Sequence, residues 1–157
     1  MRRSDREIRD IGAISELISR CDTLRLGFCD GTVPYIVPLS FGYEEIDGGF
    51  AFYVHGAKHG RRHELAAKCG TVCVELDMCC GFRYLGTEDQ TCDYKSFIGE
   101  GTVEQLTGAE ARRGLELICQ HCGSAAMTCS DTVVSNTCTE KITVTKFTAK
   151  QRFLLTT

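Results

Sequence analysis

The sequence predicts a mainly β protein with peripheral helices (α+β), in which antiparallel strands close into a barrel. Short apolar or alternating segments, separated by turn signals, recur along the chain as they do in antiparallel sheets. The helical patterns are too few and too irregularly placed for repeated βαβ units, which argues against a doubly wound parallel sheet. The length of 157 residues suits one domain, so we expect residues 1–157 to form a single domain.

Two segments in the first half of the chain have the marks of helices. Ser4 and Glu7 form a capping box, and apolar residues then recur at helical spacing. We therefore predict a helix from about Asp5 to Cys21. A second, short helix is predicted over residues 60–69, directly after a Gly-rich basic segment.

The first half of the chain also contains a hairpin. Strands are predicted over 23–29 and 33–43, and the turn dipeptide Asp30-Gly31 separates them. Proline cannot donate a hydrogen bond to a ladder, so Pro38 predicts that the second strand lies at a sheet edge or contains a bulge. The same reasoning predicts further strands over 50–55, 71–77, 94–106 and 141–147.

The second half of the chain is less regular. Residues 78–91 show no clear period and are predicted to form a loop, whereas residues 123–140 are polar, rich in cysteine and ambiguous. Gly99 and Gly101 share one face of the predicted strand over 94–106. Paired glycines on one face indicate a barrel bend or the close approach of another group.

A helix with two cysteines on its apolar face is predicted after this strand, and Thr107 and Glu110 form its capping box. The cysteines, Cys119 and Cys122, are also spaced as metal ligands. The second pair of a strong zinc signature is missing, so core packing is the preferred interpretation and we expect no metal. A zinc site, the alternative, would be completed from Cys79, Cys80, Cys92, Cys129 and Cys138.

Composition and charge limit the classes of partner. A net charge of −3 gives no argument for nucleic acid or an acidic membrane surface as a partner. No apolar run approaches the length of a membrane span, and residues 1–7 lack the apolar core of a signal peptide, so we expect a cytoplasmic protein. Most of the eleven cysteines are then expected to be thiols that pack as small apolar residues.

The segment from residue 55 to residue 63, HGAKHGRRH, breaks a local rule. It runs from a strand end into the first turn of a helix, where unpaired N–H groups already carry partial positive charge. This turn contains one lysine and two arginines, which are positively charged at neutral pH, and three histidines. Their positive charges repel one another unless an anion lies among them. A phosphate would satisfy both the backbone and the arginines, and Gly56 and Gly60 would permit its close approach. A solvated basic turn without a ligand is the alternative.

Three blocks of the sequence, taken in order, are similar to a known family. They are PYIVPLSFGY at 34–43, FYVHGAKHGRR at 52–62 and YKSFIGEG at 94–101. With this order and spacing the chain resembles the pyridoxamine 5′-phosphate oxidase-like flavoproteins, and most closely their 5-nitroimidazole-resistance (Nim-type) branch. The resemblance extends over nearly the whole chain.

The resemblance implies a split antiparallel barrel that binds flavin mononucleotide (FMN), with FAD as the alternative, at the interface of a homodimer. It also implies a catalytic role for His55 beside the flavin. The residues that it assigns to the cofactor are Pro38, Leu39, Ser40 and Phe41 along the ring, His55, Gly56 and Ala57 at a strand end, Lys58, Gly60, Arg61 and Arg62 near the phosphate, and Ser96 and Ile98 on a facing strand.

The activity that the resemblance implies is that of an FMN-dependent oxidoreductase. Such an enzyme would reduce a small electrophile, for example a nitro-aromatic, with electrons from a pyridine nucleotide or another donor. His55 would orient the substrate or donate a proton, although a hydrogen-bonded structural histidine is an alternative at this position. A non-catalytic flavin or small-ligand binding protein, for example a sensor, would need the same cofactor site and is the alternative function.

Overall fold

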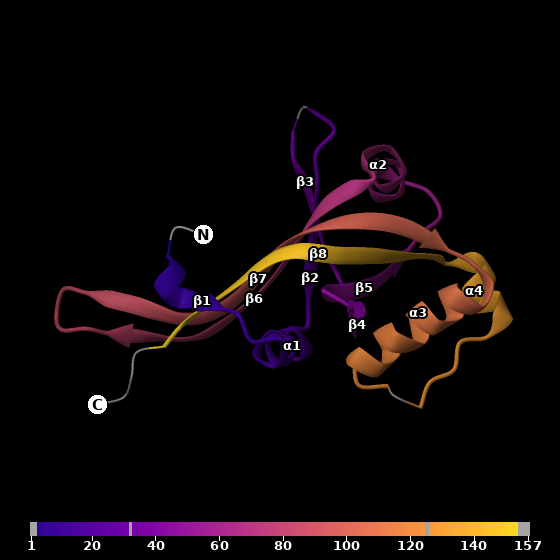
Figure 1. Cartoon of the computed structure of the whole chain (residues 1–157). Coiled ribbons are helices and arrows are strands. Elements are labelled where there is room, and N and C mark those ends of the chain that lie inside the picture. Colours follow the sequence, from indigo (N-terminus) through magenta and orange to yellow (C-terminus); the bar gives the residue numbers. More distant parts are fainter. Residues whose placement is uncertain (1–2, 32, 125, 154–157) are drawn as a thin grey trace.

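The computed structural model describes residues 3–31, 33–124 and 126–153, and its strands form one antiparallel sheet of eight strands. The strand order is β3-β2-β6-β7-β8-β5-β4, and β1 pairs with β8 outside this path. The long strands curve and cross one another (Figure 1). A core of buried apolar side chains packs against them, as predicted for a barrel. The strands are β1 (Glu7–Ile8), β2 (Leu24–Phe28), β3 (Tyr35–Leu39), β4 (Phe41–Ile46), β5 (Gly49–Gly56), β6 (Thr71–Tyr84), β7 (Gln90–Leu106) and β8 (Cys138–Arg152).

Helices lie around the sheet, as expected. In Figure 1, α1 and α2 lie on opposite sides of the crossing made by the long strands β7 and β8, and α3 lies near α4 at one end of the molecule. None of the helices in the described ranges has both the length and the apolar character to cross a membrane. They are a short 3-10 turn η1 (Ser4–Arg6), α1 (Ile11–Ser19), α2 (Arg61–Cys69), α3 (Gly108–His121) and α4 (Asp131–Asn136).

The barrel is split between β3 and β4, two strands that follow one another in the chain but lie at opposite ends of the strand order. The single strand predicted over 33–43 is therefore wrong, because the chain turns at Ser40 and joins a different part of the sheet. The hairpin of β2 and β3 is confirmed, with Arg25 opposite Pro38. β3 is an edge strand, as the proline predicts.

The N-terminal helix is shorter than predicted. Its N-cap is Asp10, whose Oδ2 accepts a hydrogen bond from the backbone N–H of Ala13 at 2.8 Å. Ser4 does not begin the helix, and Glu7 lies in β1 opposite Lys150. The chain thus uses the residues before Asp10 to add a short strand to β8, and the predicted capping box is wrong.

The segment 78–91, predicted as a loop, is mostly strand. β6 and β7 continue as a two-stranded ribbon to Tyr84 and Gln90, with a register shift between Cys79 and Gly81. None of the β6 residues from Asp77 onward is fully buried. The ribbon therefore lacks the alternation of apolar and polar residues by which a half-buried strand is recognised.

Two clusters of buried side chains stabilise the barrel and its helices. The larger lies inside the sheet under α1 and α2, and its phenylalanine rings meet mostly at tilted or edge-on angles. Gly99 and Gly101 face this core, where a Cβ atom would lie 2.5 Å from Val144 and 2.3 Å from Ile142. The predicted close approach at these glycines is confirmed, and the approaching group is β8.

The second cluster packs α3 against β4 and β5. Thr107 is the N-cap of α3, as expected, but its side chain makes no capping hydrogen bond. Cys119 packs partly buried against this cluster beside Cys129, whereas Cys122 is exposed. Core packing is thus confirmed for Cys119 and wrong for Cys122.

The ambiguous segment 123–140 contains α4 and the start of β8. Ser130 caps α4 through its side chain, which accepts a hydrogen bond from the N–H of Val133. β8 begins at Cys138 and continues to Arg152, well beyond the strand predicted over 141–147. The early start of β8 is important for the site, because its first residues lie against β5 and α2.

Candidate functional site

The corner between β3 and β4 meets the end of β5. Phe41 pairs with Val54, so Ser40 and His55 are the next residues on two neighbouring strands. Both side chains are exposed. Partial burial, followed by the nearby charge of Arg62, lowers the pKa of His55 below its ordinary value. The lowered pKa favours the neutral imidazole, which can donate one hydrogen bond and accept another.

Helix α2 begins without a side-chain cap. Its N-cap is Gly60, whose φ of 105° lies in the left-handed region that favours glycine. A Cβ atom at Gly60 would meet nothing within 4 Å, so the space in front of the helix is open. The first-turn N–H groups of this nine-residue helix thus lack a side-chain acceptor, which is the usual condition for anion binding at a helix start.

Arg61 is the cation available at this helix start. Its guanidinium lies over the ring of Tyr35, 4.6 Å from the ring centre. None of the ion pairs among the described residues includes Arg61, and the side chain is exposed. Arg61 therefore combines a fixed position with an unneutralised charge.

Arg62 has a different environment from that expected of a phosphate ligand. Its guanidinium forms an ion pair with Glu140, and the two side chains are 11% and 3% exposed. A Cβ atom at Gly56 would lie 2.7 Å from Arg62 Nη2, so the absent side chain of Gly56 makes room for the arginine. Nη2 is buried and has no hydrogen-bond partner among the described residues. Arg62 is thus a largely buried partner of Glu140, and its place near a phosphate stays a prediction.

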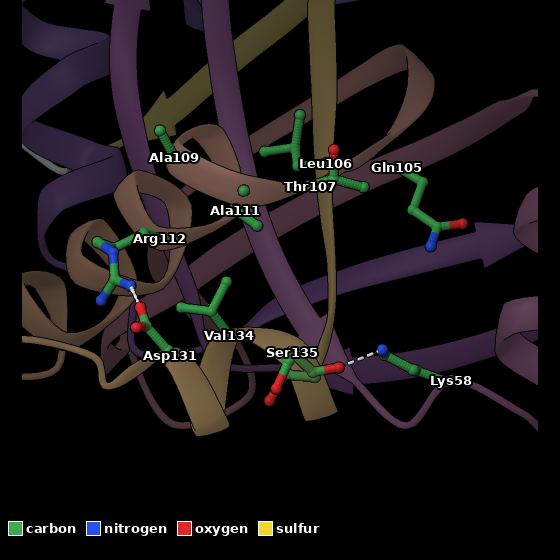
Figure 2. Close-up of a pocket in the computed structure, with 12 residues that line it drawn as sticks. Lys58, Gln105, Leu106, Thr107, Ala109, Ala111, Arg112, Asp131, Val134 and Ser135 are labelled. Carbon is green, nitrogen blue, oxygen red and sulfur yellow. Dashed lines mark hydrogen bonds and ion pairs between the residues drawn. The ribbon is translucent and has the colours of Figure 1, made fainter.

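Lys58 contacts α4. Its Nζ donates a hydrogen bond to the backbone carbonyl of Ser135, between α2 and α4 (Figure 2). Lys58 there lines a cavity of about 500 Å³ whose wall includes the start of α3 and the ion pair between Arg112 and Asp131. Of the residues that the resemblance assigns to the cofactor, only Lys58 lines this cavity.

The remaining predicted residues divide between the two faces of the sheet. Leu39 is half-buried, and Phe41 is fully buried beside Phe52 and His121. Phe41 is thus a core residue, and only its backbone can contact a ligand. Ala57 is exposed in the turn before α2.

Pro38, Ser96 and Ile98 lie on the outer face of the sheet. Register places Pro38 and Ile98 in one row across β3, β2, β6 and β7, with Arg25 and Glu75 between them. Arg25 forms ion pairs with Glu75 at 3.0 Å and with Asp77 at 2.6 Å. These carboxylates make the row unsuitable for a phosphate.

The outer face also contains an apolar groove. A cavity of about 360 Å³ lies over β2, between β3 and β6, where Gly27 leaves space between its neighbours. Ile36 and Ile98, which are 63% and 48% exposed, border the same face. Exposed apolar surface of this kind is typical of a ligand-binding or subunit interface.

Two residues of the site were missed by sequence reasoning. Tyr35 supports Arg61, and Glu140 holds Arg62. A signal for Glu140 was present, because Cys138, Glu140 and Ile142 share one strand face and the other two are apolar. The sequence gives no comparable signal for Tyr35, because its contact depends on how α2 lies against β3.

Comparison with known proteins adds independent findings. Residues 10–151 match the model of the family described as pyridoxamine 5′-phosphate oxidase. No curated protein gives a significant sequence match.

Solved structures share the fold. A candidate 5-nitroimidazole antibiotic resistance protein from Bacteroides thetaiotaomicron is 26% identical, with a TM-score of 0.79 over 92% of this chain and 86% of that one. The flavocytochrome Anf3 from Azotobacter vinelandii is 14% identical, with a TM-score of 0.81 over 98% of this chain and 72% of that one. A FAD-binding protein from Mesorhizobium loti is 15% identical, with a TM-score of 0.66 over 94% and 98% of the two chains.

Proposed function

The chain belongs to the pyridoxamine 5′-phosphate oxidase family, and on this premise we propose that it is an FMN-dependent oxidoreductase. Its substrate would be a small electrophile such as a nitro-aromatic, reduced with electrons from a pyridine nucleotide or another donor. One observation carries the proposal. At the split of the barrel, Ser40 lies beside His55, and the open start of α2 with Arg61 comes directly after this strand end.

The helix start fits the phosphate of FMN. The first turn of α2 offers backbone N–H groups without a side-chain acceptor, and Arg61 adds a charge that no carboxylate of the described residues neutralises. Gly60 leaves the approach open because it has no side chain. A phosphate bound here would remove the repulsion between Arg61 and the positive end of the helix.

The flavin ring would lie along the β3–β4 corner, where Ser40 and the backbone of Phe41 lie beside His55. Bound flavin supplies the electron transfer, and the protein supplies position and environment. The neutral His55 imidazole can donate a hydrogen bond to the substrate and hold it in place.

A second copy of the chain would complete the site. The outer-face residues Pro38, Ser96 and Ile98 lie on the same sheet as an apolar groove, which supports burial of this face against a partner. We therefore propose a symmetric homodimer with flavin at the interface. We also propose a cytoplasmic setting, because all eleven cysteines are free thiols.

The phosphate assignment is tested with two ligands that share a ring. Arg61→Ala should weaken FMN at least about tenfold and leave riboflavin, which lacks the phosphate, nearly unchanged, because a hydrogen bond to a charged group contributes about 1.5–3 kcal/mol. Fluorescence titration of both ligands gives the affinities. The matched control is Arg113→Ala, which removes an exposed arginine from α3. Equal weakening of both ligands by Arg61→Ala would show that Arg61 does not recognise the phosphate.

The activity is tested by the flavin that the purified protein releases, identified by mass, and by steady-state turnover with reduced nicotinamide and a nitroimidazole. One FMN per chain and turnover that falls in His55→Gln support the oxidoreductase. Flavin binding without turnover for any donor would favour the non-catalytic binding protein or sensor. Release of FAD alone would correct the cofactor.

A further inference from the structure

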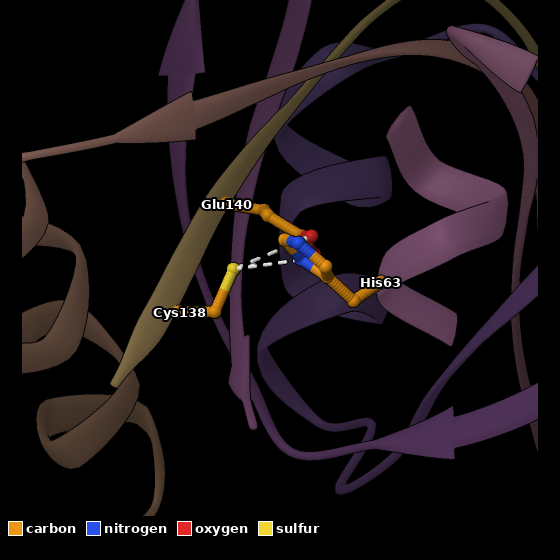
Figure 3. Close-up of side chains that lie close together, drawn as sticks. All are labelled: His63, Cys138 and Glu140. Atoms are coloured by element: carbon orange, nitrogen blue, oxygen red, sulfur yellow. Dashed lines mark hydrogen bonds between the residues drawn. The ribbon is translucent and has the colours of Figure 1, made fainter. Parts of the chain in front are cut away.

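Three different metal-binding side chains meet between α2 and β8. His63 projects from α2, and Cys138 and Glu140 project from the start of β8 toward it (Figure 3). Cys138 Sγ lies 3.5 Å from His63 Nδ1 and 3.7 Å from Glu140 Oε1. All three ligand atoms lie within 4.8 Å of one another. Cys138 is among the cysteines considered above for a zinc site with Cys119 and Cys122, but His63 and Glu140 belong neither to that set nor to the flavin proposal.

We propose that His63, Cys138 and Glu140 bind a divalent transition-metal ion, and that the ion is Zn²⁺. Zinc bonds of about 2.3 Å to sulfur and 2.1 Å to nitrogen or oxygen, at tetrahedral angles, place sulfur roughly 3.6 Å from either of the other ligand atoms. The observed separations of 3.5 and 3.7 Å agree with this spacing. A mixed set of nitrogen, sulfur and oxygen ligands also suits zinc better than calcium or magnesium, which take oxygen ligands.

The surroundings hold the cluster in a geometry ready for a metal. Cys138 and Glu140 are 1% and 2% exposed, and both are fixed by the pairing of β8 with β5. Arg62 pairs with Glu140 Oε2, which leaves Oε1 facing the thiol. Partners that orient a ligating carboxylate in this way are typical of metal sites.

The cluster also has an open side. A cavity of about 160 Å³ is lined by His63 and Glu140 together with Gly70 and Val103. This space gives an ion a route to the ligands and leaves room for water in the fourth position. Burial raises the pKa of the Cys138 thiol, but a metal-bound thiol loses its proton outright, so the ion itself overcomes this cost.

A bound ion would join α2 to β8, two elements that are far apart in the sequence. A ligand that binds only the folded state stabilises it by about 2.7 kcal/mol at a concentration a hundredfold above its Kd. For a domain of this size we therefore expect Zn²⁺ at that concentration to raise the Tm by about 5–10 °C. The gain should disappear when the ion is chelated.

The test is Zn²⁺ binding to the full chain, measured by competition with a fluorescent chelator and by native mass spectrometry. Thiols outside the cluster can bind zinc by themselves, above all the exposed Cys79 and the half-buried Cys92, whose Sγ atoms lie 3.3 Å apart. The reference protein therefore carries Cys79→Ser and Cys92→Ser. We expect one Zn²⁺ per chain in this reference. His63→Ala and Cys138→Ser should each weaken that binding at least about a hundredfold, because loss of an outer-shell partner alone costs 10–100-fold.

Matched controls separate the site from general metal affinity. His59→Ala and Cys122→Ser remove an exposed histidine and an exposed cysteine and should leave both affinity and the rise in Tm unchanged. His63→Ala leaves the buried ion pair intact, so it keeps the test valid if Cys138→Ser is poorly folded. Zinc binding that is lost in the reference protein, or that His63→Ala leaves unchanged, would overturn the proposal.

Discussion

The first turn of α2 carries two arginines, one on its outer side and one on its inner side, and their surroundings differ. Arg61 is exposed, lies on Tyr35 and forms no ion pair with the described residues. Arg62 is largely buried, packs against Gly56 and forms an ion pair with Glu140. The outer arginine therefore has its charge available to a ligand, whereas the charge of the inner arginine is used by the fold.

This difference shows how a single basic run can serve two purposes. A repulsive group of cations at a helix start predicts an anion, but one of the anions is a carboxylate of the protein itself. Glu140 neutralises the inner side, so the charge that remains available to a ligand is on the outer side. Substitution of the inner arginine should therefore lower the stability of the fold, whereas substitution of the outer arginine should lower the affinity for a ligand.

The largest effect is expected for Arg62→Ala. Removing one partner of a buried ion pair leaves an uncompensated charge, and such changes cost about 3–5 kcal/mol. Arg61→Ala, on the outer side, should change the free energy of unfolding by less than about 0.5 kcal/mol. Urea unfolding with a metal chelator present measures both, and the midpoint should fall in Arg62→Ala without a change in the m-value.

A compensating pair of substitutions provides the control. Replacement of a buried ion pair by apolar residues of similar volume is often neutral, so Arg62→Met combined with Glu140→Leu should recover most of the lost stability. If Arg62→Ala costs no more than Arg61→Ala, the inner and outer sides do not differ as described.

Gly56→Ala should have an intermediate effect. The new methyl group would lie 2.7 Å from Arg62 Nη2, and overpacking of this kind costs about 1–3 kcal/mol. The φ angle of Gly56 is not positive, so alanine also stabilises by about 0.4–1 kcal/mol through the unfolded chain. The sign should therefore reverse in the Arg62→Ala background, where the clash is absent. Thermal melts of the four proteins measure this coupling, and an unchanged sign would mean that Gly56 is needed for another reason.

The smallest effect is expected for pH. Burial and the charge of Arg62 hold the pKa of His55 below its ordinary value of 6.5, so the unfolded chain takes up this proton first on acidification. The contribution of His55 to the free energy of unfolding is fully present above pH 6.5. It is lost as the pH falls through the lower pKa that His55 has in the folded protein. NMR titration of the imidazole should give the lowered pKa, and Arg62→Gln should raise it. A His55 pKa at or above 6.5 would contradict the environment described here.

Much of the fold could be predicted from local patterns. Half-buried strands such as β2 alternate cleanly, and Pro38 marks an edge. The ribbon formed by β6 and β7 could not be predicted. In its outer part β6 has no fully buried residue, and the residues that β7 buries there, Thr91 and Asp93, are polar. The start of α1 was missed because Asp10, and not Ser4, provides the cap. A capping box is a local signal, and pairing with β8 overrides it.

The candidate site was only partly visible in the sequence. Charge and glycine alone marked the segment from His55 to Gly60 as a candidate anion site, whereas the role of His55 was implied by the family resemblance. The separate surroundings of Arg61 and Arg62 could not be predicted, because they depend on Tyr35 and Glu140 from other strands. A run of like residues shows that charge gathers at a place, whereas the direction of each side chain is set by the tertiary structure.

The position of β8 in the sheet affects how the protein folds. β8 pairs with β1, β5 and β7, so Phe50 meets Val144 and Glu7 meets Lys150 across most of the described chain. Contacts between residues so distant in sequence require large loops to close before they contribute, and proteins rich in them fold slowly. Until β8 docks, β5 has an unpaired edge beside its aromatic side chains. During this interval in folding the chain is most exposed to aggregation, even though the completed sheet covers that edge.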